Sequence, residues 1–349
     1  MGGAEVFTRE VAKHWADYGH EVNMFTSAFP GCNREEVLDN VKIFRKGGKY
    51  SVYCHARNFY DRRFKEDHFD VVIDEINTVP FFTPKFVKHN ERVFALIHQL
   101  AREYWFYDAP IPFRHVGYYF LEDFWLHNYV DVPTVTVSES TSKDLASVGF
   151  KNVSIVHEGL DFIPLRSLPT KDARPVIVFS GRLKNAKRPE HLIKAFQIIK
   201  TKIPEAELWF LGDGPLRKKL ERNSSSGIRF FGNLDNFERR ELIKQSWVLA
   251  NPSIREGWGL NIVEANALGV PTVAYDVNGL RDSVKNGETG LLARSGDIND
   301  LAFQITSILD NSALRERLSN KALEYSAEFS WERTAKEFMS LMKLNMNER

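Results

Sequence analysis

Two short segments combine charged side chains with glycines, and both directly follow stretches that we predict to be β-strands. The segment from Glu256 to Glu264 reads Glu-Gly-Trp-Gly-Leu-Asn-Ile-Val-Glu and follows the expected strand 247–252. Its glycines allow close backbone approach, and a helix beginning at Leu260 offers free N–H groups to an anion. Glu264 lies one turn into that helix, on the face of Asn261, where a carboxylate can accept two hydrogen bonds from a vicinal diol, as on a ribose. A capped helix with a solvated glutamate is the less favoured interpretation.

The second segment runs from Ser180 to Arg188 and follows the expected strand 175–180. Arg182 and Lys187 lie at opposite ends of this loop, where both side chains can reach one ligand. A guanidinium and an ammonium together would neutralise a diphosphate, whose charge grows as it leaves. A surface loop of ordinary Lys and Arg content is the alternative, but the position directly after a strand favours the ligand site.

These loops need a scaffold of strands and helices, and the hydrophobic pattern predicts one in two parts. Short β-branched and aromatic runs alternate with amphipathic helical stretches, which is typical of parallel sheets with helices on both faces. The pattern restarts after a linker at 161–174. The expected strands are 20–26, 40–45, 69–76, 92–97, 134–137 and 153–157, then 175–180, 207–212, 228–232, 247–252, 272–275 and 290–292.

We therefore expect an α/β protein with two Rossmann-like, doubly wound domains that face each other across a cleft. The first covers residues 1–162 and the second residues 163–330. A final helix at 331–345 has no strand after it and is expected to pack back on the first domain. In such folds ligands bind at the carboxyl ends of the strands.

Composition narrows the function classes. The 349 residues carry 47 Lys and Arg against 46 Asp and Glu, so a dedicated nucleic-acid binder is disfavoured. Two cysteines and ten histidines show no metal-ligand spacing, and no Asp-x-Asp pair occurs. No apolar run approaches the ~20 residues of a membrane-spanning helix. The absence of Gly-x-Ser-x-Gly, Walker and Gly-x-Gly-x-x-Gly motifs weakens hydrolase, NTPase and dehydrogenase interpretations.

Taken together, these motifs resemble the retaining glycosyltransferases of family 4, which have the GT-B fold. The resemblance covers nearly the whole chain and rests on the order and spacing of many short segments. Two positions depart from the common pattern, since the family often has Asn where Glu158 stands and Phe where Trp258 stands. The matching segments are 2–5, His98, 137–141, 158–161, 181–187, 211–215, 251–253, 256–264, 269–273 and 286–290.

The resemblance implies roles for individual residues. Glu264 would hold the ribose hydroxyls of a nucleotide-sugar donor, and Arg182 and Lys187 its diphosphate. Gly3 would let the first helix approach the phosphates, and His98 would lie near the donor sugar. The catalytic candidates are His98, Arg182, Lys187 and Glu256, and the donor-binding candidates are Gly2, Gly3, Trp258, Gly259, Leu260, Asn261 and Glu264.

The expected function is transfer of a sugar from a nucleotide diphosphate to a glycan or lipid-linked acceptor, as in the synthesis of cell-surface polysaccharides. Retention of configuration comes from the resemblance alone. No metal and no cofactor are expected, because Arg182 and Lys187 can replace a metal clamp on the diphosphate. A non-catalytic nucleotide-sugar-binding subunit and a sugar phosphorylase on the same scaffold are the alternatives.

Two segments of the first domain bear on the acceptor and on membranes. Residues 42–65 hold eight basic residues against one acid, with aromatic residues between them. Residues 104–129 hold eleven of the 44 aromatic residues. Both suit an anionic membrane surface, and the second suits an acceptor-side wall. A solvated face over core aromatics, a buried hairpin and a dimer contact are the alternatives. We expect a cytoplasmic protein, peripheral at the cytoplasmic face of the membrane, without nucleic-acid partners.

The chain begins Met-Gly-Gly-Ala-Glu and runs directly into a helical pattern. In the fold that it resembles, the Gly-Gly turn follows the central first strand of the first sheet. We therefore expect that strand to be missing here and to lie upstream of Met1 in a longer chain, because an absent central strand exposes two unpaired edges.

Overall fold

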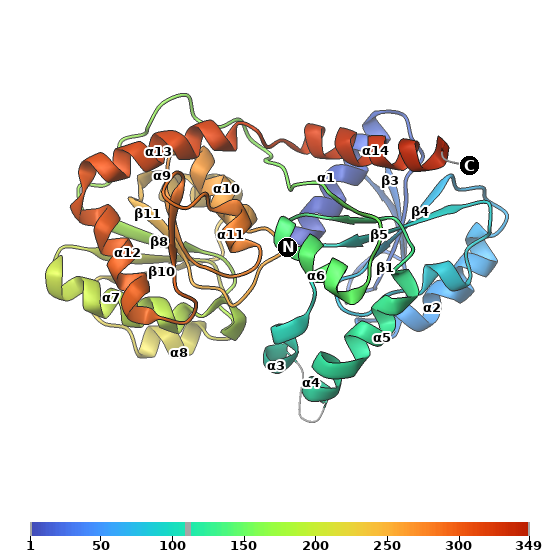
Figure 1. Ribbon diagram of the computed structural model, residues 1–349, viewed down its shortest axis with the longest axis horizontal. Coiled ribbons are helices and arrows are strands. Elements are labelled where there is room, and N and C mark those ends of the chain that lie inside the picture. The colour runs from blue at the N-terminus through green and yellow to red at the C-terminus, as the bar shows by residue number, and fades with distance from the viewer. Residues whose placement is uncertain (1, 109–112, 348–349) are drawn as a thin grey trace. The chain divides into compact units, whose positions relative to one another are not determined.

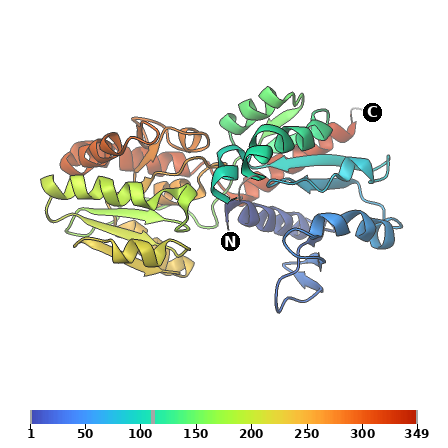
Figure 2. The ribbon, with the colours of Figure 1, turned by 90° about the horizontal axis from the view of Figure 1, so that it is seen from below.

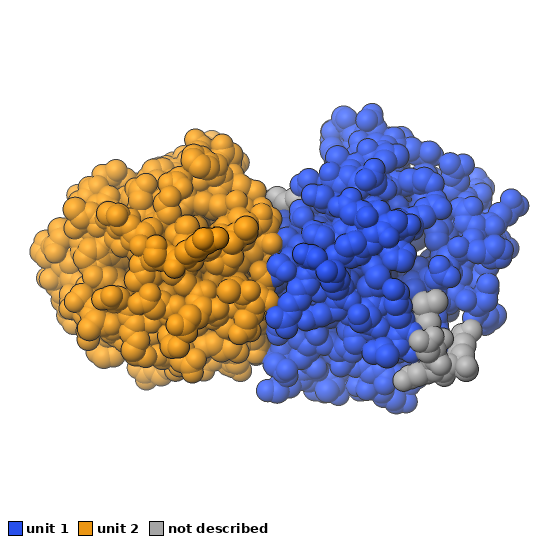
Figure 3. Space-filling model, turned by 90° about the horizontal axis from the view of Figure 1, so that it is seen from above, with its two compact units in different colours: residues 1–159, 330–349 blue, residues 160–329 orange. Residues whose placement is uncertain are grey.

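The computed structural model describes residues 2–108 and 113–347. The chain forms two compact units (Figure 3), which we treat separately. Unit 1 combines residues 1–159 with 330–349, and unit 2 is the uninterrupted stretch 160–329. The first division falls three residues before the boundary expected from the sequence, and the second falls one residue before.

Unit 2 is built around one six-stranded parallel sheet in the order β10-β9-β8-β11-β12-β13. Every residue of β8, β9, β11 and β12 is buried, as is usual for parallel strands covered on both faces. The elements are β8 (Val176–Ser180), α7 (Pro189–Lys202), β9 (Glu207–Leu211), α8 (Arg217–Arg222), β10 (Ile228–Gly232), α9 (Asn236–Gln245), β11 (Val248–Asn251), α10 (Leu260–Ala267), β12 (Thr272–Tyr275), α11 (Leu280–Ser283), β13 (Gly290–Ala293), α12 (Ile298–Asp310) and α13 (Ser312–Ser326).

Helices cover this sheet in layers (Figures 1 and 2). Helix α12 packs beside α7, and α13 packs beside α10. The core combines the apolar strand residues with the inward faces of these helices, for example Leu192 and Phe196 of α7 and Leu301 and Ile305 of α12. The amphipathic spacing of the helices therefore directs one apolar face onto the sheet.

Unit 1 contains two sheets rather than one. Strands β4, β5, β6 and β7 form a parallel sheet in that order, and β1, β3 and β2 form another. The elements are α1 (Gly3–Asp17), β1 (Asn23–Thr26), β2 (Glu35–Leu38), β3 (Val41–Arg45), α2 (Val52–Phe59), β4 (Val71–Glu75), β5 (Arg92–Ile97), α3 (Trp105–Asp108), α4 (Phe113–Val116), α5 (Glu122–Leu126), β6 (Thr134–Thr136), α6 (Glu139–Val148), β7 (Val153–Ile155) and α14 (Trp331–Asn347).

The expectation of purely parallel sheets is wrong at one strand. β2 pairs antiparallel with β3, with Glu36 opposite Ile43. Its residues are mostly exposed, so no buried face left a period-2 pattern for the sequence to show. In the part of the chain that the structure describes, β1 and β4 each have a strand neighbour on one side only.

The last helix returns to unit 1. Helix α14 packs along α1 (Figure 1), and the Trp15 indole donates a hydrogen bond to the Ala335 carbonyl at 3.0 Å. A Cβ added to Gly159 would lie 2.3 Å from the Trp331 nitrogen, so only glycine allows this approach. Thr334 Oγ1 donates to the His157 carbonyl at 2.8 Å. Helix α14 is thus joined to both α1 and the segment that follows β7.

Segments 42–65 and 104–129 each contain both packed and exposed aromatic residues: Tyr50 of the first is 78% exposed, and Tyr129 of the second is buried. Within the first segment, Phe44, Phe59 and Phe64 pack against one another with ring centroids 5.2–5.5 Å apart. In the second, Tyr119, Phe120 and Phe124 are 61–72% exposed, and residues 109–112 lie outside the described residues. Among the helices that the structure describes, none has the length and apolar character to cross a membrane.

Candidate functional site

The two motif loops of unit 2 lie where the strand order reverses. Strands β8 and β11 are neighbours at the centre of the sheet, and the chain continues from them toward opposite edges. This switch point is where open parallel sheets bind ligands, at the carboxyl ends of the strands. The loop after β8 carries Arg182 and Lys187, and the loop after β11 carries Glu256.

Lys187 and Glu256 meet across these loops. The Lys187 ammonium forms an ion pair with Glu256 Oε1, and both side chains are largely buried. Ser253 Oγ donates to the same carboxylate oxygen at 2.8 Å. Glu256 therefore holds the ammonium in place at the carboxyl ends of the central strands.

Arg182 behaves differently from Lys187. Its side chain is exposed, and it makes no ion pair or hydrogen bond with the described residues. The structure therefore does not bring Arg182 into contact with Lys187 or Glu256. Its guanidinium is available to a ligand without displacing a protein partner.

The start of α10 supplies backbone donors. Gly259 precedes the helix with φ of 101°, a conformation that glycine adopts without strain. A Cβ there would lie 3.1 Å from Ile262 Cδ1. Within the described residues, the N–H groups of Leu260 and Asn261 have no hydrogen-bond acceptor, while the Asn261 side chain donates to the Ser180 carbonyl at 2.8 Å. The turn thus presents free N–H groups next to the loop after β8.

The Trp258 side chain faces the interior of unit 2. Only 2% of the residue is exposed, and the ring packs against Phe329 with centroids 5.7 Å apart. The indole is therefore part of the core, and any contact of Trp258 with a ligand has to come from its backbone.

Glu264 has a partner that the sequence did not indicate. Arg239 of α9 donates from Nη1 to Glu264 Oε2 at 2.5 Å and from Nη2 to Oε1 at 2.9 Å. Burial lowers the pKa of Arg239, but the hydrogen bonds and charge of Glu264 outweigh it, so its pKa lies above the usual value. The pair holds the Glu264 carboxylate in one orientation, with lone pairs left for further donors.

In unit 1, His98 follows β5 and is 5% exposed. Its Nδ1 lies 3.5 Å from Glu158 Oε1, and its Nε2 lies 3.9 Å from Glu75 Oε1. Neither ring nitrogen makes a hydrogen bond to the described residues. The Phe7 ring contacts the imidazole edge-on at 5.0 Å. Two carboxylates thus flank a buried imidazole whose ring nitrogens make no hydrogen bond within the described residues.

The glycines at the start of α1 lie next to this cluster. A Cβ on Gly3 would meet the Glu158 carboxylate oxygens at 3.5 Å, an ordinary contact, so packing in unit 1 does not require glycine there. Gly2 donates its N–H to Glu5 Oε2 at 2.7 Å. One donor of the helix terminus is therefore already occupied by Glu5.

Comparison with known families decides the identity of the fold. Residues 1–162 match the family described as Glycosyltransferase Family 4, and residues 165–325 match the family described as glycosyl transferases group 1. Each half of the chain thus matches the model of one glycosyltransferase domain. The two matches support a group 1 glycosyltransferase family, and the two α/β units have the GT-B fold. That the enzyme is a retaining one stays a prediction.

Relatives and solved structures of known glycosyltransferases are similar to this chain. The D-inositol 3-phosphate glycosyltransferase of Nocardioides sp. is 29% identical over 220 residues, 55% of this chain and 48% of that protein. Sucrose-phosphate synthase from Thermosynechococcus elongatus has a TM-score of 0.81 at 19% identity, covering 100% of this chain and 94% of that one. Anabaena HepE, in complex with UDP and glucose, has a TM-score of 0.72 at 15% identity, covering 98% and 96%. Matched regions span 43–66% of the length of curated relatives.

The site residues that the sequence did not indicate lie outside the motifs and contact the motif residues through hydrogen bonds or charge. Arg239 lies 25 residues before Glu264, and Glu75 lies 23 residues before His98, and neither falls in a motif. Only the alternation of strands and helices could have indicated that Glu75 and His98 both lie at the carboxyl ends of neighbouring strands. Among the residues that the structure describes, no group of three or more His, Cys, Asp and Glu side chains is placed to hold a metal ion.

Proposed function

We propose that this protein transfers a sugar from a nucleotide-diphosphate donor to a glycan or lipid-linked acceptor, with retention of configuration and without a metal. The observation that carries the proposal is the meeting of three features at the switch point of unit 2. These are the Lys187–Glu256 pair, the free N–H groups at the start of α10, and the Glu264 carboxylate held by Arg239. A diphosphate next to a ribose diol matches this set.

The chemistry divides among these residues. The bond between the sugar anomeric carbon and the diphosphate oxygen breaks, the sugar joins an acceptor hydroxyl oxygen, and the hydroxyl proton passes to the leaving diphosphate. Negative charge builds on the diphosphate as it leaves, and Lys187, Arg182 and the α10 N–H groups stabilise that charge. Glu264 accepts hydrogen bonds from the ribose. Buried His98 is the residue that we assign to the sugar, as the family resemblance implies, and normal turnover of a His98→Asn variant would remove that assignment.

Two alternatives make different predictions. A sugar phosphorylase would use inorganic phosphate and would have no need of a carboxylate for a ribose. A non-catalytic subunit would bind the nucleotide sugar without turning it over. Two hydrogen bonds from Arg239 hold the Glu264 carboxylate in an orientation that suits a ribose. A function that uses a nucleotide sugar, either transfer or binding alone, therefore fits better than a phosphorylase.

A thermal-shift screen tests the donor class. We expect one of UDP-, GDP-, ADP- or dTDP-sugars to raise the unfolding temperature, because a ligand that binds only the folded state stabilises it. The UDP in the Anabaena HepE structure makes UDP-sugars the first probes. With the donor found, turnover with and without EDTA tests the metal-free mechanism. No shift with any nucleotide sugar would contradict the proposal, and loss of turnover in EDTA would contradict its metal-free part.

We further propose a cytoplasmic protein that binds the cytoplasmic membrane surface through the exposed aromatic residues Tyr119, Phe120 and Phe124 and the basic residues of 42–65. Aromatic side chains at this degree of exposure suit the membrane interface, where exposed Arg62 and Arg63 would meet anionic headgroups.

Co-sedimentation with liposomes tests this surface. Replacing Phe120 and Phe124 by Ser is expected to lower binding to vesicles containing phosphatidylglycerol by about tenfold, because each ring buries apolar area at the interface. Phe237 and Phe303, exposed on unit 2, serve as the matched control pair. Binding that depends neither on anionic lipid nor on Phe120 and Phe124 would exclude this surface.

A further inference from the structure

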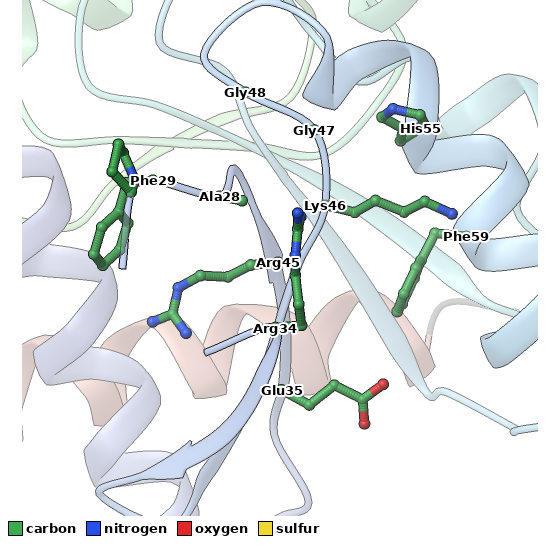
Figure 4. A pocket seen from close by; sticks show the side chains of 11 residues that line it. Ala28, Phe29, Arg34, Glu35, Arg45, Lys46, Gly47, Gly48, His55 and Phe59 are labelled. Atoms are coloured by element: carbon green, nitrogen blue, oxygen red, sulfur yellow. The ribbon is translucent and has the colours of Figure 1, made fainter. Parts of the chain in front are cut away.

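Unit 1 contains a pocket that none of the motifs occupies. It lies where β1 and β3 end and encloses about 800 Å³ (Figure 4), which is within the range of small-molecule sites. Strands β1 and β3 are parallel neighbours, so their carboxyl ends lie side by side at the same end of the sheet. The side chains that give the pocket its chemistry are Phe29, Arg34, Arg45, Lys46, His55 and Phe59.

One of the cations in this pocket has a structural task. Arg45 donates from Nη2 to Glu36 Oε1 at 2.6 Å and from Nη1 to the Asn33 carbonyl at 3.1 Å. Its guanidinium also lies 5.5 Å from the centre of the Phe29 ring. Arg45 thus fixes the wall that holds Phe29 and has its charge compensated by Glu36.

Two other cations have no such partner. Arg34 and Lys46 line the pocket, and neither side chain makes an ion pair or hydrogen bond with the described residues. Glu35 is the acid that lines the pocket, and its carboxylate lies 3.8 Å from Arg63. The pocket therefore carries uncompensated positive charge, which favours an anion.

The loop after β3 sets the position of Lys46. Gly47 has φ of 75°, and a Cβ there would lie 2.8 Å from both His55 Cδ2 and the Val52 nitrogen. Only glycine lets the loop pack this closely against α2. Figure 4 shows Lys46 extending toward the side of the pocket that holds His55 and Phe59, while Arg45 extends toward Phe29.

We propose that this pocket binds the phosphate group of a phosphorylated sugar or glycolipid acceptor. Arg34 donates a pair of hydrogen bonds to phosphate oxygens, Lys46 adds a point charge, and His55 adds a ring N–H. Phe29, 61% exposed, offers its face to the C–H side of the sugar ring. The assignment of the ligand as the acceptor rests on the proposed function, whereas phosphate binding by the pocket does not.

The histidine signals of the full-length protein test the pocket directly. In protein labelled with 13C in its histidine rings, the His55 signal is assigned with a His55→Gln variant. D-glucose 6-phosphate is then titrated in the presence of saturating nucleotide, which occupies the site in unit 2. We expect a saturable shift of the His55 signal with D-glucose 6-phosphate, and none with D-glucose or D-glucuronate at the same concentration.

A charge-matched pair of variants locates the binding. Replacing Arg34 and Lys46 by Gln is expected to weaken D-glucose 6-phosphate binding by about tenfold or more, because two charge-assisted contacts are lost. Replacing exposed Arg62 and Lys65 by Gln removes the same charge outside the pocket and is expected to change affinity less than about twofold. Equal losses in both variants, an unmoved His55 signal, or an equal shift with glucuronate would overturn the proposal.

Vesicles identify the source of the phosphate. If it is presented on a lipid, the Arg34→Gln/Lys46→Gln variant loses binding to phosphatidylglycerol vesicles relative to the Arg62→Gln/Lys65→Gln control. If it is soluble, the two variants bind these vesicles equally while only the control retains D-glucose 6-phosphate binding. A protein that binds D-glucose 6-phosphate here but turns over no nucleotide sugar would disprove the proposed function and leave the pocket intact.

Discussion

Replacing Lys187 by Met is expected to lower kcat for sugar transfer by about 100- to 1,000-fold, the loss typical of removing one preorganised charge partner. The ammonium lies in the loops beyond the carboxyl ends of β8 and β11, where Glu256 and Ser253 orient the charge. Its contribution grows as the diphosphate gains charge, so the effect falls on kcat more than on donor binding. The variant also leaves the Glu256 carboxylate without its cation, next to an anionic leaving group.

Two further variants make this result interpretable. Lys194→Met removes an exposed ammonium from α7 and is expected to keep normal kcat. Glu256→Gln keeps the Lys187 ammonium but removes the negative charge that holds it in place. This variant is expected to lower kcat less than Lys187→Met does. Steady-state kinetics give kcat, and calorimetric titration gives the donor Kd. If Lys187→Met turned over donor at the wild-type rate, Lys187 would have no part in catalysis.

Replacing Glu264 by Ala is expected to weaken nucleotide binding by about tenfold to a hundredfold, because two hydrogen bonds from a ribose to a charged acceptor are lost. The same change leaves Arg239, whose side chain is 21% exposed, without its carboxylate. Breaking a buried ion pair by removing one partner costs 3–5 kcal/mol, and partial exposure of Arg239 brings the expected loss of stability toward about 3 kcal/mol.

A double variant separates binding from stability. Glu264→Gln with Arg239→Gln leaves no unpaired charge, so we expect it to regain much of the unfolding free energy but not the nucleotide affinity. Glu241→Ala, which breaks the surface pair with Lys244 on the same helix, is expected to cost less than about 1 kcal/mol. Chemical denaturation and calorimetric titration are the measurements. Recovery of nucleotide affinity in the double variant would show that Glu264 serves only to pair Arg239.

The parts of the fold that the sequence predicted are those where burial leaves a pattern. Strands such as β8 and β11 are apolar throughout, and each expected strand has a counterpart whose ends differ by a few residues. β2 was missed because its solvent-facing residues show no alternation. For the aromatic residues of 42–65 the sequence left open a membrane surface or a core beneath a solvated face, and in the structure Phe44, Phe59 and Phe64 form a cluster with one another.

The candidate site was predictable where its residues share a loop with glycine. Gly259 and Glu264 belong to one segment, so their spacing carries the information. Arg239 was not predictable, because its pairing with Glu264 depends on how α9 and α10 lie on the sheet. Trp258 belongs to the same segment, and its side chain lies in the core, so the donor contact that the resemblance implies is left to its backbone. The roles assigned to all the candidate site residues, Arg182 and His98 among them, stay predictions.

The return of α14 to α1 has a consequence for the order of events during synthesis. Domains generally fold as units while the chain emerges, with the amino-terminal one first. Here residues 160–329 are made as one uninterrupted stretch, whereas unit 1 needs residues 330–347, made after them, to cover Trp15 and Phe7. The first half of the chain therefore has an uncovered apolar face until residues 330–347 are made. Unit 2 can finish folding before unit 1 does.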